Sequence, residues 1–308
     1  MEFAVAIQSL RDMKLTEKPW KPFDYQNEIE AQTQTVFFEA WETVYGEKRR
    51  PDRLYFGSEF CQYRLISSAA VLKVLEYSQR NGLAFTFVTP YVHNAKFHAL
   101  TTILTELQQE AVRVGEEVEV VVNDWGVYYH IRKQFPILRP VIGRLLNKVI
   151  RDPRIADYYD NEDAPPRAVN VVKGSGLVSE WFGRFLEAVD TVRLEFDEVI
   201  QGFGQEMKSH ALSFHYPFGC VASGSACMVG FMDSDKKDKF RGDPNCKQQC
   251  QRYTFELKNK QFTDMTHRIF QKGNTAFYAH NRTLIETGLR RLMQAGTARV
   301  VYSPRLPV

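Results

Sequence analysis

Short apolar runs and helical patterns alternate between Leu54 and Asp124, and this stretch decides the fold. The runs LYFG at 54–57, LAFTFVT at 83–89 and VEVVVND at 118–124 are typical of buried strands. The segments between them, 65–79 and about 97–114, have the apolar spacing of helices. Because successive parallel strands need crossover connections of this length, we expect a parallel sheet with both faces covered.

The second half of the chain continues this alternation less regularly. About eight strands in roughly 250 residues predict a (β/α)8 TIM-barrel-like domain over 53–308, with a doubly wound open sheet as the alternative. Residues 1–52, polar with scattered aromatic side chains, are predicted to form an N-terminal extension, and 228–260 a charged excursion that bears cysteines. The later strand candidates are 169–172, 191–196, 211–214, 275–278 and 299–302, with helices near 177–189 and 283–295.

Composition limits the classes of partner. The 308 residues are 44% hydrophobic, enough for a full core, and 40 basic against 37 acidic side chains leave a net charge of only +3. This surplus gives no support for a nucleic-acid groove or an anionic membrane surface, so nucleic acid stays open but unsupported by charge. No apolar run approaches the roughly 20 residues of a membrane span, and the opening residues do not resemble a signal peptide. We therefore expect a cytoplasmic protein, whose thiols serve metal binding, redox chemistry or packing.

Four of the five cysteines are concentrated in the late stretch 220–250. Cys220, Cys227, Cys246 and Cys250 are separated by gaps of six, eighteen and three residues. Zinc knuckles favour a gap of two, so this spacing favours a 4Fe-4S cluster over structural zinc. The small residues around Cys220 and Cys227 would let backbone amides approach the sulfur atoms. The alternative is a set of thiols that hold no metal.

Cys61 is the remaining cysteine, and it follows the first convincing strand, 54–57. In a barrel, residues just beyond the carboxyl ends of the strands share one rim, so Cys61 could meet the late cysteines there. A cluster takes four ligands and the chain offers five, so one cysteine must be a spare or face the substrate. Taken alone, Cys61 could equally be a small core residue.

Polar residues at the other predicted strand ends are candidates for catalysis. His93, Asn123 and Asp124 lie where a barrel places its active site, although Asn123 and Asp124 could instead cap the following helix. His215, five residues before Cys220, is either close to the bound cofactor or a satisfied core histidine. The chain has no GxSxG, HExxH, GxxxxGK[ST] or GxGxxG motif, which argues against serine hydrolases, zincins, P-loop proteins and Rossmann dinucleotide-binding enzymes.

Several motifs together resemble the collagenase-like peptidase family U32 across roughly residues 53–303. The chain is most similar to short members of that family that act in oxygen-independent ubiquinone biosynthesis. The motifs are FGSEFCQYR at 56–64, VVNDWG at 121–126, GRLLN at 143–147 with RDPR at 151–154, and SFHYPFGCVASGSAC at 213–227.

The resemblance implies a 4Fe-4S cluster and a role in hydroxylation without oxygen. In the short members a cysteine after the first strand joins a late cysteine and a C-x3-C pair, which match Cys61, Cys227, Cys246 and Cys250. Cys220 matches the first cysteine of the C-x6-C arrangement of other members, so both ligand patterns are present. The implied substrate is a small aromatic or quinone-precursor molecule, or an RNA base, and the implied partner is a related family member. Two alternatives remain, a collagenase-like peptidase and a non-catalytic iron–sulfur subunit of a hydroxylase complex.

Overall fold

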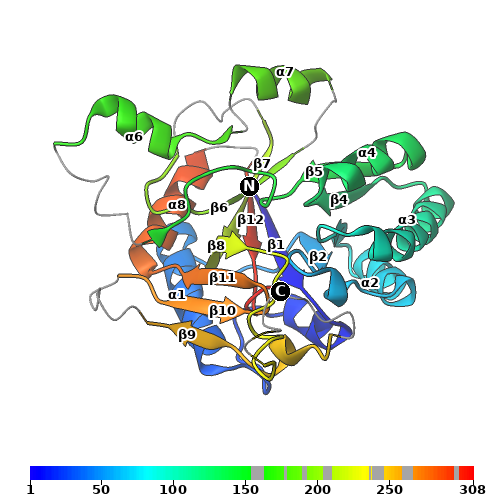
Figure 1. The fold of residues 1–308 in the computed structure, drawn as a ribbon, viewed down its shortest axis with the longest axis horizontal. Coiled ribbons are helices and arrows are strands. Elements are labelled where there is room, and N and C mark those ends of the chain that lie inside the picture. The colour runs from blue at the N-terminus through cyan, green and yellow to red at the C-terminus, as the bar shows by residue number, and fades with distance from the viewer. Residues whose placement is uncertain are drawn as a thin grey trace.

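Eight parallel strands close into a barrel at the centre of the computed structural model (Figure 1). β1 pairs with both β2 and β12, with Glu2 opposite Arg299, which closes the barrel and confirms the predicted (β/α)8 fold class. The structure describes residues 1–153, 163–176, 179–188, 193–203, 210–235, 237, 246–258, 266–294 and 298–308. The barrel strands are β1 (Glu2–Ile7), β2 (Arg53–Gly57), β3 (Ala84–Val88), β4 (Val118–Val122), β5 (Leu138–Ile142), β6 (Leu194–Asp197), β7 (Leu212–Tyr216) and β12 (Arg299–Tyr302).

Residues 1–52 belong to the barrel, which corrects the expectation of an extension outside it. They supply β1 and α1 (Glu28–Tyr45), the first strand and the first long covering helix. α1 begins at a capping box between Asn27 and Glu30 and packs Phe37 against Tyr302 of β12, with ring centroids 4.7 Å apart. This segment is therefore part of the barrel and its core.

Helices cover the outside of the barrel. α1 and α8 lie beside each other, joined by a hydrogen bond from the Tyr45 hydroxyl to the Leu289 carbonyl (3.0 Å), and α2, α3 and α4 cover the opposite side (Figure 1). No helix in the described part of the chain combines the length and apolar character that a membrane span requires. Their bounds are α2 (Ser68–Arg80), α3 (Asn94–Val114), α4 (Trp125–Gln134), and α8 (Arg282–Gln294).

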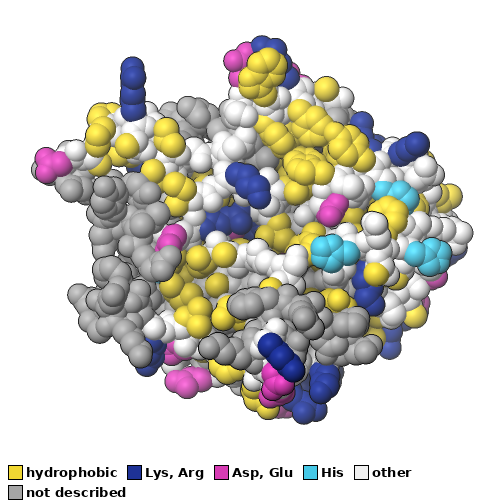
Figure 2. Space-filling model, viewed as in Figure 1, with side chains coloured by type: hydrophobic (Ala, Val, Ile, Leu, Met, Phe, Trp, Pro, Cys, Tyr) yellow, Lys and Arg dark blue, Asp and Glu magenta, His cyan; other side chains and the backbone are white. Residues whose placement is uncertain are grey.

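Two further helices, α6 (Pro166–Lys173) and α7 (Glu180–Ala188), lie between β5 and β6. The strand expected at 169–172 is wrong: Pro166 occupies the first helical turn, where its fixed φ favours a helix, and the β-branched run continues it. α7 falls within the helix expected near 177–189, and its Phe182 and Phe185 rings pack against Trp125 of α4. Hydrophobic side chains gather on the surface over these two elements (Figure 2). Residues 177–178, 189, 191–192 and 295 of the expected elements, and residue 154 of the RDPR motif, lie outside the described residues.

A second, antiparallel sheet is inserted between β7 and α8. Its strand order is β8-β11-β10-β9, so the strand expected at 275–278 forms part of this sheet rather than of the barrel. An apolar cluster that includes Phe60, Phe270 and Phe277 joins the sheet to the loop after β2. Parts of the expected excursion, 236, 238–245 and 259–260, lie outside the described residues. The strands are β8 (Phe218–Ser223), β9 (Phe255–Leu257), β10 (Ile269–Lys272) and β11 (Thr275–Ala279).

Charged side chains close the amino-terminal end of the barrel interior. The guanidinium of Arg299, 1% exposed, donates to Glu2 (2.6 Å), to Glu119 (2.7 Å) and to the Tyr55 hydroxyl (2.6 Å). Arg53 adds a second bond to Glu2 at 2.6 Å. Burial alone would raise the pKa of Glu119. The positive charges of Arg299 and Arg53 outweigh the effect of burial and hold this pKa below its usual range. This end of the barrel is therefore filled by paired charges.

His280, just after β11, makes stability depend on pH. The ring is 3% exposed and contacts the rings of Tyr216 and Tyr278, and neither ring nitrogen has a hydrogen-bond partner among the described residues. Burial lowers the pKa of His280 to about 3. Below about pH 6.5 this histidine is therefore protonated in the unfolded chain but stays neutral in the folded chain. The free energy of unfolding then falls by about 1.4 kcal/mol for each pH unit.

We expect the free energy of unfolding to fall less in His280→Phe than in the wild type when the pH is lowered from about 6.5 to about 4.5. The difference between the two falls should be about 2 to 3 kcal/mol. Phenylalanine keeps an aromatic ring between Tyr216 and Tyr278 but cannot take up a proton. Urea unfolding at the two pH values measures the difference. His98→Phe, at an exposed position on α3, is the matched control. Equal pH dependence in wild type and His280→Phe would contradict this account of the buried ring.

Candidate functional site

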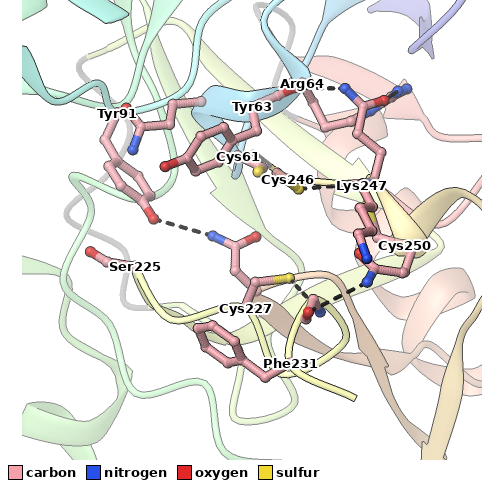
Figure 3. Close-up of a pocket in the computed structure, with 15 residues that line it drawn as sticks. Cys61, Tyr63, Arg64, Tyr91, Ser225, Cys227, Phe231, Cys246, Lys247 and Cys250 are labelled. Carbon is pink, nitrogen blue, oxygen red and sulfur yellow. Dashed lines mark hydrogen bonds between the residues drawn. The ribbon is translucent and has the colours of Figure 1, made fainter. Parts of the chain in front are cut away.

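Four of the five cysteines line one cavity on the side of the barrel where the strands end (Figure 3). Cys61 comes from the loop after β2, Cys227 from the loop after β8, and Cys246 and Cys250 from the segment around the short 3-10 helix Gln249–Gln251. Tyr63, Arg64, Tyr91, Ser225 and Lys247 also line the cavity. The fold thus brings together cysteines that are up to 189 positions apart in the chain, from Cys61 to Cys250.

Side-chain hydrogen bonds hold the loops of this cavity in place. Arg64 donates to the Gln248 side chain (2.9 Å), and Gln248 donates back to the Tyr63 carbonyl (2.9 Å), which ties the loop after β2 to the Cys246–Cys250 segment. The Asn274 amide donates to the carbonyls of Phe60 (2.7 Å) and Gly224 (2.8 Å). Asn274 follows Gly273, whose φ of 60° allows the tight turn between β10 and β11.

Backbone amides point at two of the sulfur atoms. The N–H of Gly230 donates to Cys227 Sγ at 3.1 Å, and the N–H of Gln248 donates to Cys246 Sγ at 3.4 Å. A Cβ at Gly230 would lie 3.2 Å from Cys227 Sγ, so the close approach favours glycine there. Amide donors of this kind stabilise a thiolate and adjust the potential of a metal group that it holds.

Burial opposes the ionisation of three of the four cavity thiols, those of Cys61, Cys227 and Cys250. Burial, with a contribution from the neighbouring thiols, raises the pKa of Cys61 to about 11. Burial also raises the pKa of Cys227 and of Cys250, although Arg64 and Lys272 act against it at Cys250. Because metal ligation requires thiolates, a metal group here must displace protons and supply the positive charge that offsets their burial.

Cys220 lies apart from this cavity. It is fully buried in β8 and packs in the apolar cluster with Phe60, Phe218 and Phe277. Its backbone N–H donates to Asp197 at the end of β6 (3.0 Å). Burial, together with the Asp197 carboxylate, raises the pKa of Cys220 to about 12. The structure therefore separates Cys220, as a packed neutral thiol, from the other four cysteines.

The cysteines of the cavity can be compared with what a metal ion and an iron–sulfur cluster each require. Among the described residues, no three His, Cys, Asp or Glu side chains lie close enough together to hold one metal ion. A cubane cluster is larger than an ion and takes its four thiolates at wider separation, around its corners. The cavity offers four cysteines of this kind, with backbone amide donors to two of their sulfur atoms.

The three residues predicted to be catalytic lie on the same side of the barrel but have structural partners. Asp124 caps α4, accepting from the N–H groups of Gly126 (2.7 Å) and Val127 (3.1 Å), which confirms the alternative considered for it. The buried Asn123 accepts from Leu145 N–H (3.1 Å) and donates to the Thr89 carbonyl (3.0 Å).

His93 is exposed at the start of α3, with its ring near that of Tyr91. It does not line the cysteine cavity, and neither do Asn123 and Asp124. Catalytic roles for these three residues stay predictions.

His215, predicted to lie near the cofactor, projects into the barrel from β7 and does not line the cysteine cavity. Its Nε2 atom is paired with the Glu195 carboxylate of β6. Sequence reasoning missed Glu195, as well as the buried carboxylates of Glu59 and Asp197, which both pair with Arg144 (2.8 and 2.6 Å). The place of Glu59 and Asp197 in the sequence could have found them, because each lies at or just after the carboxyl end of a barrel strand. Glu195, the second residue of β6, has no such signal.

Fold and site together define a (β/α)8 barrel with a thiol-lined cavity at its carboxyl-terminal side. No family model matches the chain, and no curated protein matches it. Among solved structures, the chain is similar to a protein described as a U32 peptidase, with a TM-score of 0.40 and 10% sequence identity over 100% of this chain and 94% of that chain. Membership of the U32 family stays a prediction that rests on the sequence motifs.

Proposed function

We propose that this chain is an iron–sulfur protein whose 4Fe-4S cluster is held by Cys61, Cys227, Cys246 and Cys250. The observation that carries the proposal is their arrangement: these four cysteines line one cavity, while Cys220 packs elsewhere. When bound, such a cluster supplies one-electron chemistry at a potential set by its ligands and their hydrogen bonds.

The protein's own residues shape the cavity and place hydrogen-bond donors and positive charge at the cysteines. Gly230 and Gln248 donate N–H groups to ligand sulfur atoms, and Arg64 and Lys272 place positive charge near Cys250. Tyr91 lies at the edge of the cavity, with its hydroxyl donating to the Gly224 carbonyl (2.9 Å). The Tyr91 hydroxyl is therefore one of the polar groups that a substrate in this cavity could contact.

Hydroxylation of a small aromatic or quinone-precursor substrate without oxygen is the activity we propose for this site. The support is the resemblance of the sequence motifs to the short U32 members, together with the cysteine set that those members use. A related subunit as partner and a location in the cytoplasm belong to the same proposal. The alternative activity is peptide hydrolysis, the activity for which the similar solved structure is named.

Complementation separates the two activities. In cells that lack the gene for this chain and grow without oxygen, the wild-type chain should restore the hydroxylated quinone, and the Cys246→Ala variant should not. The same cells grown with oxygen should show no difference. Purified protein should release no peptides from gelatin. Gelatin cleavage that persists in Cys246→Ala, without any effect on quinone content, would replace hydroxylation by hydrolysis.

A further inference from the structure

Exposed apolar side chains gather on the two segments that carry three of the cavity cysteines, 227–235 and 246–258. A hydrogen bond from the Gln249 side chain to the Gly230 carbonyl (3.5 Å) joins these segments, which we call the cysteine face. In the described part of the chain, five of the twelve exposed large hydrophobic side chains lie on this face. They are Met228 (63% exposed), Met232 (41%), Tyr253 (44%), Phe255 (39%) and Leu257 (38%). A surface of this kind is typical of a contact with another macromolecule.

The charged side chains on and around the cysteine face are mostly positive. Glu256 is paired with Arg268 (2.8 Å), which leaves two acidic side chains among the described residues there, Asp233 and Asp235. Six basic side chains stand against these two. They are Arg64 and Lys247, which line the cavity (Figure 3), Lys96, which lies over the Tyr63 ring, and Lys237, Arg252 and Lys258, which are exposed. The excess of four also outnumbers the charge of about −2 that an oxidised cluster with four thiolates carries.

Two of the four proposed ligands reach the surface at this face. Cys227 and Cys246 are half-buried, whereas Cys61 and Cys250 are buried. A cluster bound to these four thiolates would therefore lie directly beneath the cysteine face, with the sulfur atoms of Cys227 and Cys246 nearest to solvent. An electron could then reach the cluster from a donor that stays outside the cavity.

We infer that the cysteine face is the docking surface of an acidic electron-carrier protein that delivers single electrons to the cluster. The inference rests on the proposed function, because it needs the cluster as the electron acceptor. In each transfer the reduced flavin or iron–sulfur group of the carrier loses one electron, and the oxidised cluster gains that electron. No bond forms or breaks, and no proton is transferred.

Charge and extent select this partner. Positive side chains attract an acidic partner from a distance, and exposed apolar side chains form the contact once it has docked. The apolar side chains extend from Met228 to Leu257 outside the cavity, where a small anion would not contact them. A second copy of this chain would present the same positive face to its partner across a twofold axis, which its charge disfavours.

Reduced flavodoxin, an acidic flavoprotein that donates one electron at a time, is the probe. Mixed with the oxidised holoprotein without oxygen, it should bleach the absorption of the cluster. The second-order rate constant should fall about tenfold between about 0.02 M and about 0.3 M salt, because salt screens the attraction. The double variant Lys237→Glu/Arg252→Glu, at two exposed positions that do not line the cavity, should lower this constant about tenfold at low salt.

Matched controls separate docking from damage to the cluster. Lys73→Glu/Lys133→Glu, at exposed positions on α2 and α4, makes the same change in net charge and should stay within about twofold of the wild type. Photoreduced deazariboflavin, a small uncharged donor, should reduce the wild type and both variants at equal rates.

The apolar part of the face is tested by Met228→Gln/Phe255→Gln. This variant should raise the flavodoxin concentration that gives half the maximal rate about tenfold, because the docked complex loses apolar contact. Met293→Gln, at a position on α8 that is 54% exposed, should leave this concentration unchanged.

Iron and sulfide content keep the inference apart from the proposed function. A chain without iron and sulfide would refute the proposed function, and this inference with it. A chain with a full cluster whose reduction by flavodoxin is independent of salt, or equal in the two charge variants, would overturn this inference alone. If sedimentation showed an oligomer that dissociates in Met228→Gln/Phe255→Gln, the cysteine face would join subunits, which would also overturn the inference.

Discussion

Alanine at Cys61, Cys227, Cys246 or Cys250 should leave protein purified without oxygen nearly free of iron, whereas Cys220→Ala should keep the wild-type content. The reason is the separation of the five thiols, four around one cavity and one in an apolar cluster. A cubane cluster that loses one of its four thiolates is exposed at that corner and is lost or degraded. Iron, acid-labile sulfide and the absorption spectrum measure the outcome.

Cys220→Ala is the matched control, because it removes a buried thiol from the same part of the fold. Alanine also fits the apolar cluster without adding a polar atom. If Cys220→Ala lost the iron and Cys61→Ala kept it, the ligand set would include the C-x6-C pair Cys220 and Cys227 in place of Cys61. That result would contradict the assignment made from the cavity.

Replacing Arg299 by methionine should lower the free energy of unfolding by about 3 to 5 kcal/mol. Methionine keeps much of the volume of the side chain but leaves Glu2 and Glu119 without their main counter-charge in a buried space. The Tyr55 hydroxyl loses its donor as well. Urea unfolding at neutral pH measures the loss.

The control for this substitution is Arg290→Met on α8, where the arginine side chain is 54% exposed. A surface change of this kind should stay within about 0.5 kcal/mol of the wild type. A loss below about 1 kcal/mol for Arg299→Met would show that the charge network contributes little to the stability of the barrel.

The sequence predicts most of the barrel because its strands are short apolar runs between helical patterns, as at 83–89 and 118–124. β1 is different: its six residues precede a long polar stretch, and their partners on β12 lie at the other end of the chain. β5 contains Pro140, which argues against a strand in the middle of a sheet. Its pairing with β4 and β6 shows that the surrounding barrel outweighs this local signal.

The cysteine cavity is predicted only in part. Cys61 is a candidate ligand because it follows a predicted strand. The other four cysteines are candidates because they lie close together in the sequence. The spacing of the cysteines could not exclude Cys220 from the ligand set, because only six residues separate it from Cys227, and two ligands of one cluster can be that close in the sequence. The separation arises from tertiary structure: Cys220 lies within β8 and packs inward, and Cys227 lies in the loop beyond that strand.

The charged pairs inside the barrel leave no local signal in the sequence. Glu2, Glu119 and Arg299 are distributed over nearly the whole chain, and the barrel alone brings them together. The same holds for His215 and Glu195, whose two strands are adjacent in the barrel and place both side chains in its interior. Such contacts follow from closure of the sheet and not from spacing along one element.

Iron and acid-labile sulfide per chain, measured on wild-type protein purified without oxygen, test the central claim most directly. We predict about four of each, with the broad absorption of thiolate-bound iron. Absence of both iron and sulfide, even after incubation with ferrous iron and sulfide under reducing conditions, would contradict the proposal that the four cysteines of the cavity hold a 4Fe-4S cluster.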